Sequence, residues 1–197
     1  MNADTVDIAE EDRWRVITYR LLARLLAAEP DASVIQMLQA IDIQTEETAL
    51  TKAWYALAQV SHSVDLELLE QEYNALFIGF TSGEVIPYAS RYLTGFLMEK
   101  PLAKLRQDLI HSGIQRQQSV YEPEDHIAAV FEAMSLLIES ADDAQWTFLN
   151  QHVLPWAQQF FKDIQLANSA QFYKPVGQLG EAFVALESTL FTMEQNQ

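Results

Sequence analysis

Apolar residues recur at a spacing of three or four along almost the whole chain, and this periodicity limits the fold more than any other feature. It is the spacing that lines one face of an α-helix, whereas a half-buried strand alternates apolar and polar residues. No stretch of the sequence alternates in that way, and the six Gly and six Pro are too few for a turn-rich β fold. The sequence therefore predicts an all-α protein, a helical bundle.

The apolar stripes and the residues that interrupt them place the helices. They predict helices over about residues 10–28, 34–41, 46–61, 66–77, 101–112, 123–140, 142–153, 156–164 and 171–193. The first of these has Trp14, Ile17 and Leu21 on its apolar side, and Pro155 forces a kink or a new helix start. Gly113 is the predicted C-cap of the helix before it.

A polar segment over residues 113–122 divides the chain. It contains Gln115, Gln117 and Gln118 and few apolar side chains, which is typical of a linker. We expect it to join an N-terminal helical part, residues 1–112, to a C-terminal helical part, residues 123–197, within one compact unit.

The charge of the chain limits its partners. With 12 Lys and Arg against 28 Asp and Glu, the formal net charge is −16, which disfavours nucleic acid and anionic membranes and favours a basic partner. Solubility is the simpler explanation of the same charge. The acidic N-terminal residues do not form a secretory signal, and no apolar run approaches the roughly 20 residues that span a bilayer. We therefore expect a cytoplasmic protein without an integral membrane segment.

The segment Glu122-Pro123-Glu124-Asp125-His126 opens the predicted helix at residue 123. A proline suits the first turn of a helix, and acidic residues there face the positive end of the helix dipole. Helix capping does not require the histidine that follows. His126 is thus either a hydrogen-bonded structural residue or part of a binding site.

Metal and catalytic chemistry find little support. The chain has no Cys, and no Glu-x-x-His pair of the kind that holds a di-iron centre; Asp108-x-x-His111 is the nearest approach. Ser90, Asp125 and His126 offer the residue types of a catalytic triad. Adjacent residues on a helix point about 100° apart, however, so Asp125 would not orient His126. We expect no metal site and no catalytic residue.

The loop over residues 79–84 contains Gly79 and Gly83 but no following Lys-Ser or Lys-Thr, and no strand precedes it, so it is not a P-loop. A nucleotide-binding switch or enzyme that uses this loop is the alternative function.

Binding is the remaining possibility. Asp125 and His126 would form an acidic, hydrogen-bonding lip, and Tyr88, Tyr92 and Phe96 would line an adjacent apolar groove. Such a surface suits a peptide with a positive end and a hydrophobic body. The alternatives are that the aromatic residues only pack in the core, and that the protein is a helical scaffold without a peptide site.

Three segments together are characteristic. They are Glu72-Tyr73-Asn74-Ala75-Leu76-Phe77-Ile78-Gly79, Pro87-Tyr88-Ala89-Ser90-Arg91-Tyr92-Leu93 and Glu122-Pro123-Glu124-Asp125-His126. In this order and spacing they resemble the TorD/DmsD/NarJ family of redox-enzyme maturation chaperones. The segments Leu154-Pro155-Trp156 and Phe172-Tyr173 are similar to the C-terminal half of that family, so the resemblance runs from about Trp14 to the last helix.

The resemblance implies a non-catalytic cytoplasmic chaperone for a molybdopterin oxidoreductase. Such proteins bind the twin-arginine signal peptide and the apo form of the enzyme, and hold back export until the cofactor is inserted. By motif match, Asp125 and His126 are expected to contact the peptide, with Glu122, Tyr88 and Ser90 beside them and Tyr92 in the groove. No cofactor is implied, apart from the weak guanine-nucleotide binding associated with parts of the family.

The resemblance leaves the assembly and the client enzyme open. It allows a monomer or a domain-swapped dimer, for which residues 113–122 would be the hinge. Pro87-Tyr88 favours the TorD-like subgroup, whereas Leu154-Pro155-Trp156 favours the DmsD-like one.

Overall fold

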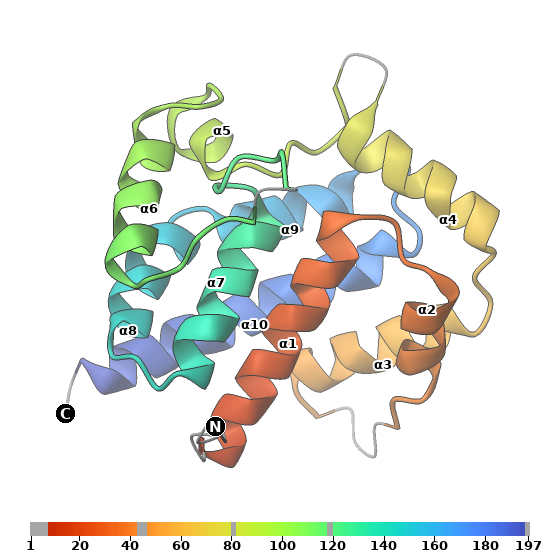
Figure 1. Cartoon of the computed structure of the whole chain (residues 1–197). Helices are drawn as coiled ribbons and strands as arrows, with labels where there is room; N and C mark the ends of the chain where they lie inside the picture. Colours follow the sequence, from red (N-terminus) through yellow and green to blue (C-terminus); the bar gives the residue numbers. More distant parts are fainter. Residues whose placement is uncertain (1–7, 43–46, 80–81, 118–119, 196–197) are drawn as a thin grey trace.

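The chain folds into a bundle of helices (Figure 1). The computed structural model describes residues 8–42, 47–79, 82–117 and 120–195, and within these ranges the only β pairing is one isolated bridge. The helices are α1 (Glu10–Ala27), α2 (Ala32–Gln39), α3 (Ala49–Ser61), α4 (Leu66–Tyr73), α5 (Ala89–Thr94), α6 (Lys100–His111), α7 (Ile127–Glu139), α8 (Ala144–Phe148), α9 (Ala157–Leu166) and α10 (Tyr173–Glu194), with π-helical turns η1 (Asn74–Ile78) and η2 (Leu149–Val153). The all-α prediction is confirmed.

Three helix–helix interfaces organise the bundle. Helix α1 packs along α7, and α10 packs along α9 and against α3. Figure 1 shows α1 and α7 side by side in front of α10, with α2, α3 and α4 at one end of the molecule and α5 and α6 at the other. Helices from both sides of residues 113–122 therefore share one core. The role of that segment as a hinge stays a prediction.

Aromatic side chains join the central helices. The ring of Tyr19 on α1 meets those of Phe131 on α7 and Phe183 on α10 edge-on, at centroid distances of 5.0 and 4.7 Å. Trp14 and Ile17, expected on the apolar side of α1, are instead 62% and 50% exposed. The buried positions in that part of the helix are Arg15, Val16, Thr18 and Tyr19.

One predicted helix boundary is wrong. Helix α7 begins at Ile127 and not at Pro123, and no acidic residue lies in its first turn. The reason is a long-range pairing. The Ala89 N–H donates to the Asp125 carbonyl and the Ile127 N–H donates to the Pro87 carbonyl, both at 2.9 Å. These bonds hold His126 in an extended conformation, and the His126 N–H donates to the Pro123 carbonyl at 3.1 Å, so Pro123 belongs to the preceding turn.

The other predicted helices are close to those observed. The segment after Asp65 ends in η1, whose Leu76 and Phe77 lie in a π-helical turn that the periodicity does not reveal. Pro155 separates η2 from α9, as a new helix start requires. The short helix α5 has no counterpart among the predictions. Within the described residues, no helix has the length and apolar character needed to cross a bilayer.

Candidate functional site

Two motifs that are distant in sequence form one structural unit. Tyr88 and His126 make the isolated antiparallel bridge, so the Pro-Tyr-x-Ser segment lies directly against the Asp-His pair. The Ser90 N–H donates to Asp125 Oδ2 at 2.9 Å, and the Ser90 hydroxyl donates to the same oxygen. The spacing of the two motifs in the sequence thus reflects a direct contact between the start of α5 and the start of α7.

Asp125 is buried with only half of its carboxylate paired. The side chain is 1% exposed, and Oδ1 has no hydrogen-bond partner among the described residues. Buried polar atoms are almost always hydrogen-bonded, because an unpaired one loses its hydration without compensation. Oδ1 is therefore a place where an additional donor would be stabilised.

His126 is the N-cap of α7. Its Nδ1 accepts a hydrogen bond from the Ala128 N–H at 3.2 Å, and its ring meets that of Tyr88 edge-on at 5.1 Å. Burial lowers the pKa of His126 to about 4, against the opposing effect of the Glu122 and Asp125 carboxylates. The ring is therefore neutral near pH 7. His126 has a structural role, and its role in binding stays a prediction.

The two glutamates of the motif have different partners. Glu122 is exposed and accepts a hydrogen bond from the Tyr88 hydroxyl. Glu124 pairs with Arg106 at 2.8 Å and with Arg116 at 3.4 Å. Glu122 thus remains without a cationic partner among the described residues, whereas Glu124 ties α6 and the polar segment to the start of α7.

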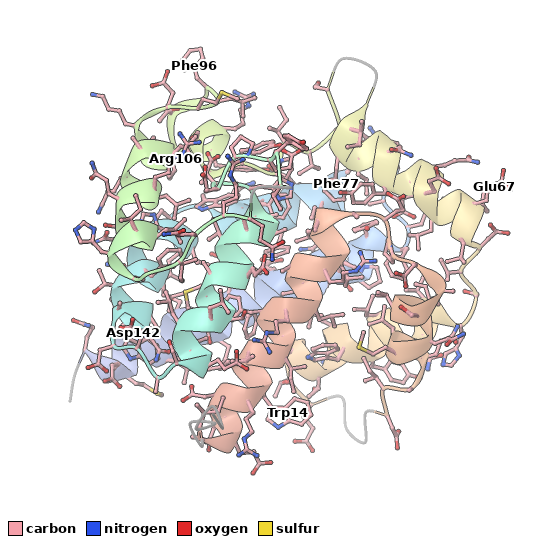
Figure 2. All side chains as sticks on the ribbon, in the orientation of Figure 1. Trp14, Glu67, Phe77, Phe96, Arg106 and Asp142 are labelled. Carbon is pink, nitrogen blue, oxygen red and sulfur yellow. The ribbon has the colours of Figure 1, made fainter. Side chains whose placement is uncertain are left out.

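The structure does not bring the three predicted aromatic residues together. Tyr88 lies against His126, whereas the Tyr92 hydroxyl donates to Asp163 Oδ2 on α9 at 2.9 Å. Phe96 is 69% exposed and projects from the loop after α5 (Figure 2). A groove lined by these three rings is not formed. The binding roles of Tyr88, Ser90 and Tyr92 stay predictions.

The Glu-Tyr pair of the first motif has a structural role. The Glu72 carboxylate accepts hydrogen bonds from the main-chain N–H groups that begin α10, those of Gln171, Phe172 and Tyr173. The Tyr73 hydroxyl donates to the Leu26 carbonyl at 3.3 Å. This pair therefore holds α4 against α10 and α1.

The glycines of the 79–84 loop are explained by close backbone contacts. Gly79 has a φ of 61°, and a Cβ at Gly83 would lie 2.3 Å from the Leu76 carbonyl oxygen. The loop folds back on η1, and residues 80–81 lie outside the described part. Nucleotide binding by this loop stays a prediction.

Asp108 and His111 do not act together. The His111 ring bonds the Gln107 carbonyl, and Asp108 Oδ2 bonds His152 Nε2 at 2.7 Å. In the described ranges, no group of three or more His, Asp or Glu side chains is arranged to hold a metal ion.

Beside His126 a groove of about 500 Å³ runs between α1 and α7. Its lining is mostly small or apolar and comes from both helices and from residues before α7: Arg20, Ala23, Arg24, Ala27, Val120, Glu122, His126, Ala128, Ala129, Glu132, Ser135 and Leu136. Sequence reasoning found only Glu122 and His126 among these residues. The others become neighbours only through the packing of α1 on α7, although their spacing on each helix is that of one face.

Comparisons with known proteins agree with this architecture. A family model described as nitrate reductase delta subunit matches residues 43–162. The chaperone protein TorD of Shewanella loihica is 27% identical, over 95% of this chain and 97% of that protein. TorD of Actinobacillus succinogenes is 26% identical, over 86% and 93%.

A solved structure has the same fold. It is a redox enzyme maturation protein from Archaeoglobus fulgidus, similar at a TM-score of 0.57 and 18% identity over 94% of this chain and 99% of that one. The family model, which is described as nitrate reductase delta subunit, and the TorD relatives explain the three sequence motifs. The chain belongs to the TorD-like family of redox-enzyme maturation proteins.

Proposed function

We propose that the protein is a cytoplasmic, non-catalytic chaperone of a molybdopterin oxidoreductase. In this proposal it binds the twin-arginine signal peptide and the apo form of the enzyme, and delays export until the cofactor is inserted. The observation that carries the proposal is the half-paired, buried Asp125 carboxylate, which directly precedes His126 in the wall of the groove between α1 and α7.

The chemistry of the peptide matches the site. A guanidinium group donates to carboxylates in a planar fork, so arginine is well suited to the exposed Glu122, and the charge of the buried Asp125 carboxylate adds to the attraction. The apolar part of a signal peptide would cover the alkyl lining of the groove. A chain with a net charge of −16 also attracts a cationic peptide over long range, most strongly at low salt.

The relatives support the same function. Those described above are named chaperones, and the similar solved structure is named a maturation protein of redox enzymes.

Binding of a synthetic twin-arginine peptide, measured by isothermal titration calorimetry, tests the proposal. The isosteric Asp125→Asn variant should keep the bonds from Ser90 and bind the peptide about tenfold more weakly, because it removes a negative charge from a buried position next to His126 in the groove wall. Glu70→Gln is the matched control, since it removes the same charge from an exposed position on α4. Equal affinity of wild type for this peptide and for one with two Gln in place of the arginines would contradict the proposal.

The assembly is tested separately. We propose a monomer or a dimer that exchanges its halves about residues 113–122. In size-exclusion chromatography at two concentrations, a single monomeric elution volume would contradict the exchanged dimer.

A further inference from the structure

The groove between α1 and α7 carries an excess of uncompensated negative charge. Both of its arginines are already paired: Arg20 with Glu139 at 2.5 Å, and Arg24 with Asp31 at 2.9 Å. Glu122 and Glu132 line the same groove, and neither has a cationic partner among the described residues. The groove therefore has room for a cation at two separate carboxylates.

The two carboxylates lie at different places along the groove. Glu122 precedes α7, whereas Glu132 lies in the middle of that helix and is exposed. Between them, Ala128 and Ala129 on α7 face Ala23 and Ala27 on α1, so small alkyl groups form the walls. A ligand that is complementary to the whole groove is elongated, with cationic groups opposite the two carboxylates and an apolar surface between them.

His126 adds a hydrogen-bond donor to this groove. Its Nδ1 accepts from the Ala128 N–H, and burial keeps the ring neutral, so the single ring proton belongs to Nε2. The side chain is 7% exposed and lines the groove, and Nε2 has no partner in the described part of the chain. Oδ1 of Asp125 is the only fully buried side-chain polar atom without a partner among the described residues, so the Nε2–H of His126 is open to the groove, where it can donate to an acceptor such as a main-chain carbonyl oxygen.

We propose that the groove between α1 and α7 holds the peptide main chain, with His126 Nε2–H donating to a peptide carbonyl and Glu132 binding a cationic side chain. Glu132 is then a specificity-determining residue outside the motif that contains Asp125 and His126. This inference rests on the proposed function, since it concerns how the same peptide is held.

The capping role of His126 suggests a selective variant. Asparagine is a good N-cap, and its side-chain oxygen can accept from the Ala128 N–H, but it is too short to place a donor where Nε2 lies. His126→Asn should therefore keep the thermal stability near that of wild type at pH 7 and weaken peptide binding about fivefold to tenfold. His126→Ala should lower both.

Glu132→Gln tests the second anchor without disturbing the fold, because the side chain is exposed. We expect a threefold or larger loss of affinity and a weaker dependence of affinity on salt, whereas Glu70→Gln should change neither by more than a factor of about two. A peptide that keeps the arginine pair but has its other cationic residues replaced by Gln should bind wild type and Glu132→Gln equally.

The outcomes separate this inference from the proposed function. If wild type does not bind the peptide, the proposed function itself fails. If Asp125→Asn weakens binding while His126→Asn and Glu132→Gln behave like Glu70→Gln, the peptide lies elsewhere and the inference is overturned. It is also overturned if the groove variants change the oligomeric state of the protein, because the groove would then hold a second copy of the chain.

Discussion

At the scale of single residues, the three carboxylates of the acidic motif before α7 bind different partners. Glu124 pairs with two arginines, Asp125 with Ser90, and Glu122 with Tyr88. The three neighbouring carboxylates thus share no partner: Glu124 binds α6 and the polar segment, Asp125 binds α5, and Glu122 binds the segment before α5. The sequence shows them as one acidic cluster at a helix start. Of the three, only Glu122 is exposed to a ligand, whereas the unpaired oxygen of Asp125 is buried.

The buried His126 makes stability depend on pH. Its pKa is about 4 in the folded protein and about 6.5 in the unfolded chain. Above pH 6.5 neither state holds the extra proton, whereas between pH 6.5 and 4 only the unfolded chain does, so the free energy of unfolding falls as the pH falls. At pH 5 this loss should be about 2 kcal/mol for His126 alone.

Urea unfolding of wild type and His126→Asn at pH 7 and pH 5 measures this contribution. The variant keeps a capping group but has nothing to titrate, so it should lose about 2 kcal/mol less than wild type between the two pH values. The comparison cancels His152, whose pKa is also lowered by burial, because both proteins contain it. Equal losses would show that His126 is accessible to protons in the folded state.

At the scale of helices, α10 depends on a cap supplied from another helix. Its N-cap, Phe172, makes no side-chain cap, and the Glu72 carboxylate of α4 instead accepts from the N–H groups of Gln171, Phe172 and Tyr173, the first residue of α10. A carboxylate there also faces the positive end of the helix dipole. Glu72→Ala should therefore lower the free energy of unfolding by about 1–2 kcal/mol in urea denaturation.

Glu70→Ala is the control for that variant, because it removes an exposed carboxylate from the same helix without touching α10. It should change the free energy of unfolding by less than about 0.5 kcal/mol. Similar losses in the two variants would mean that the charge of α4, and not the cap, stabilises the protein.

The same scale shows what periodicity can and cannot predict. Local spacing was sufficient for α1, α6 and α10, whose ends lie near the predicted residues. It was insufficient at Pro123, where the local sequence favours a helix start. There, hydrogen bonds of Asp125 and Ile127 to Ala89 and Pro87 move the start of the helix to Ile127. The site follows the same rule: the motif drew attention to Asp125 and His126, but the groove that His126 shares with Glu132 forms only when α1 packs on α7.

At the scale of the whole molecule, the first and last helices are joined by a buried polar network. The Arg15 guanidinium donates to both Glu187 oxygens, at 2.7 and 2.9 Å, and Glu187 also accepts from the Tyr19 hydroxyl at 2.8 Å. Gln145 accepts from the same guanidinium at 2.9 Å, and the Trp146 ring lies 4.8 Å beneath it. The network connects α1, α8 and α10, and it keeps in place the helix that forms one wall of the groove.

Removing one partner of this network should strongly lower the free energy of unfolding. Glu187 is fully buried and Arg15 is 4% exposed, so Glu187→Ala leaves a buried guanidinium without its main counter-charge. We expect a loss of about 3–5 kcal/mol in the free energy of unfolding by urea. The matched control is Glu139→Ala, which breaks the exposed pair with Arg20 and should cost less than about 1 kcal/mol.

A double variant separates charge burial from packing. Replacing the pair by Arg15→Met with Glu187→Leu removes both charges together, so much of the loss seen in Glu187→Ala should be recovered. Recovery would mean that the pair serves mainly to fix how α1 sits on α10, because an apolar pair is then nearly as stable. If the double variant is as unstable as Glu187→Ala, the hydrogen bonds of Tyr19 and Gln145 to the pair carry the stability, and the wall of the groove depends on them.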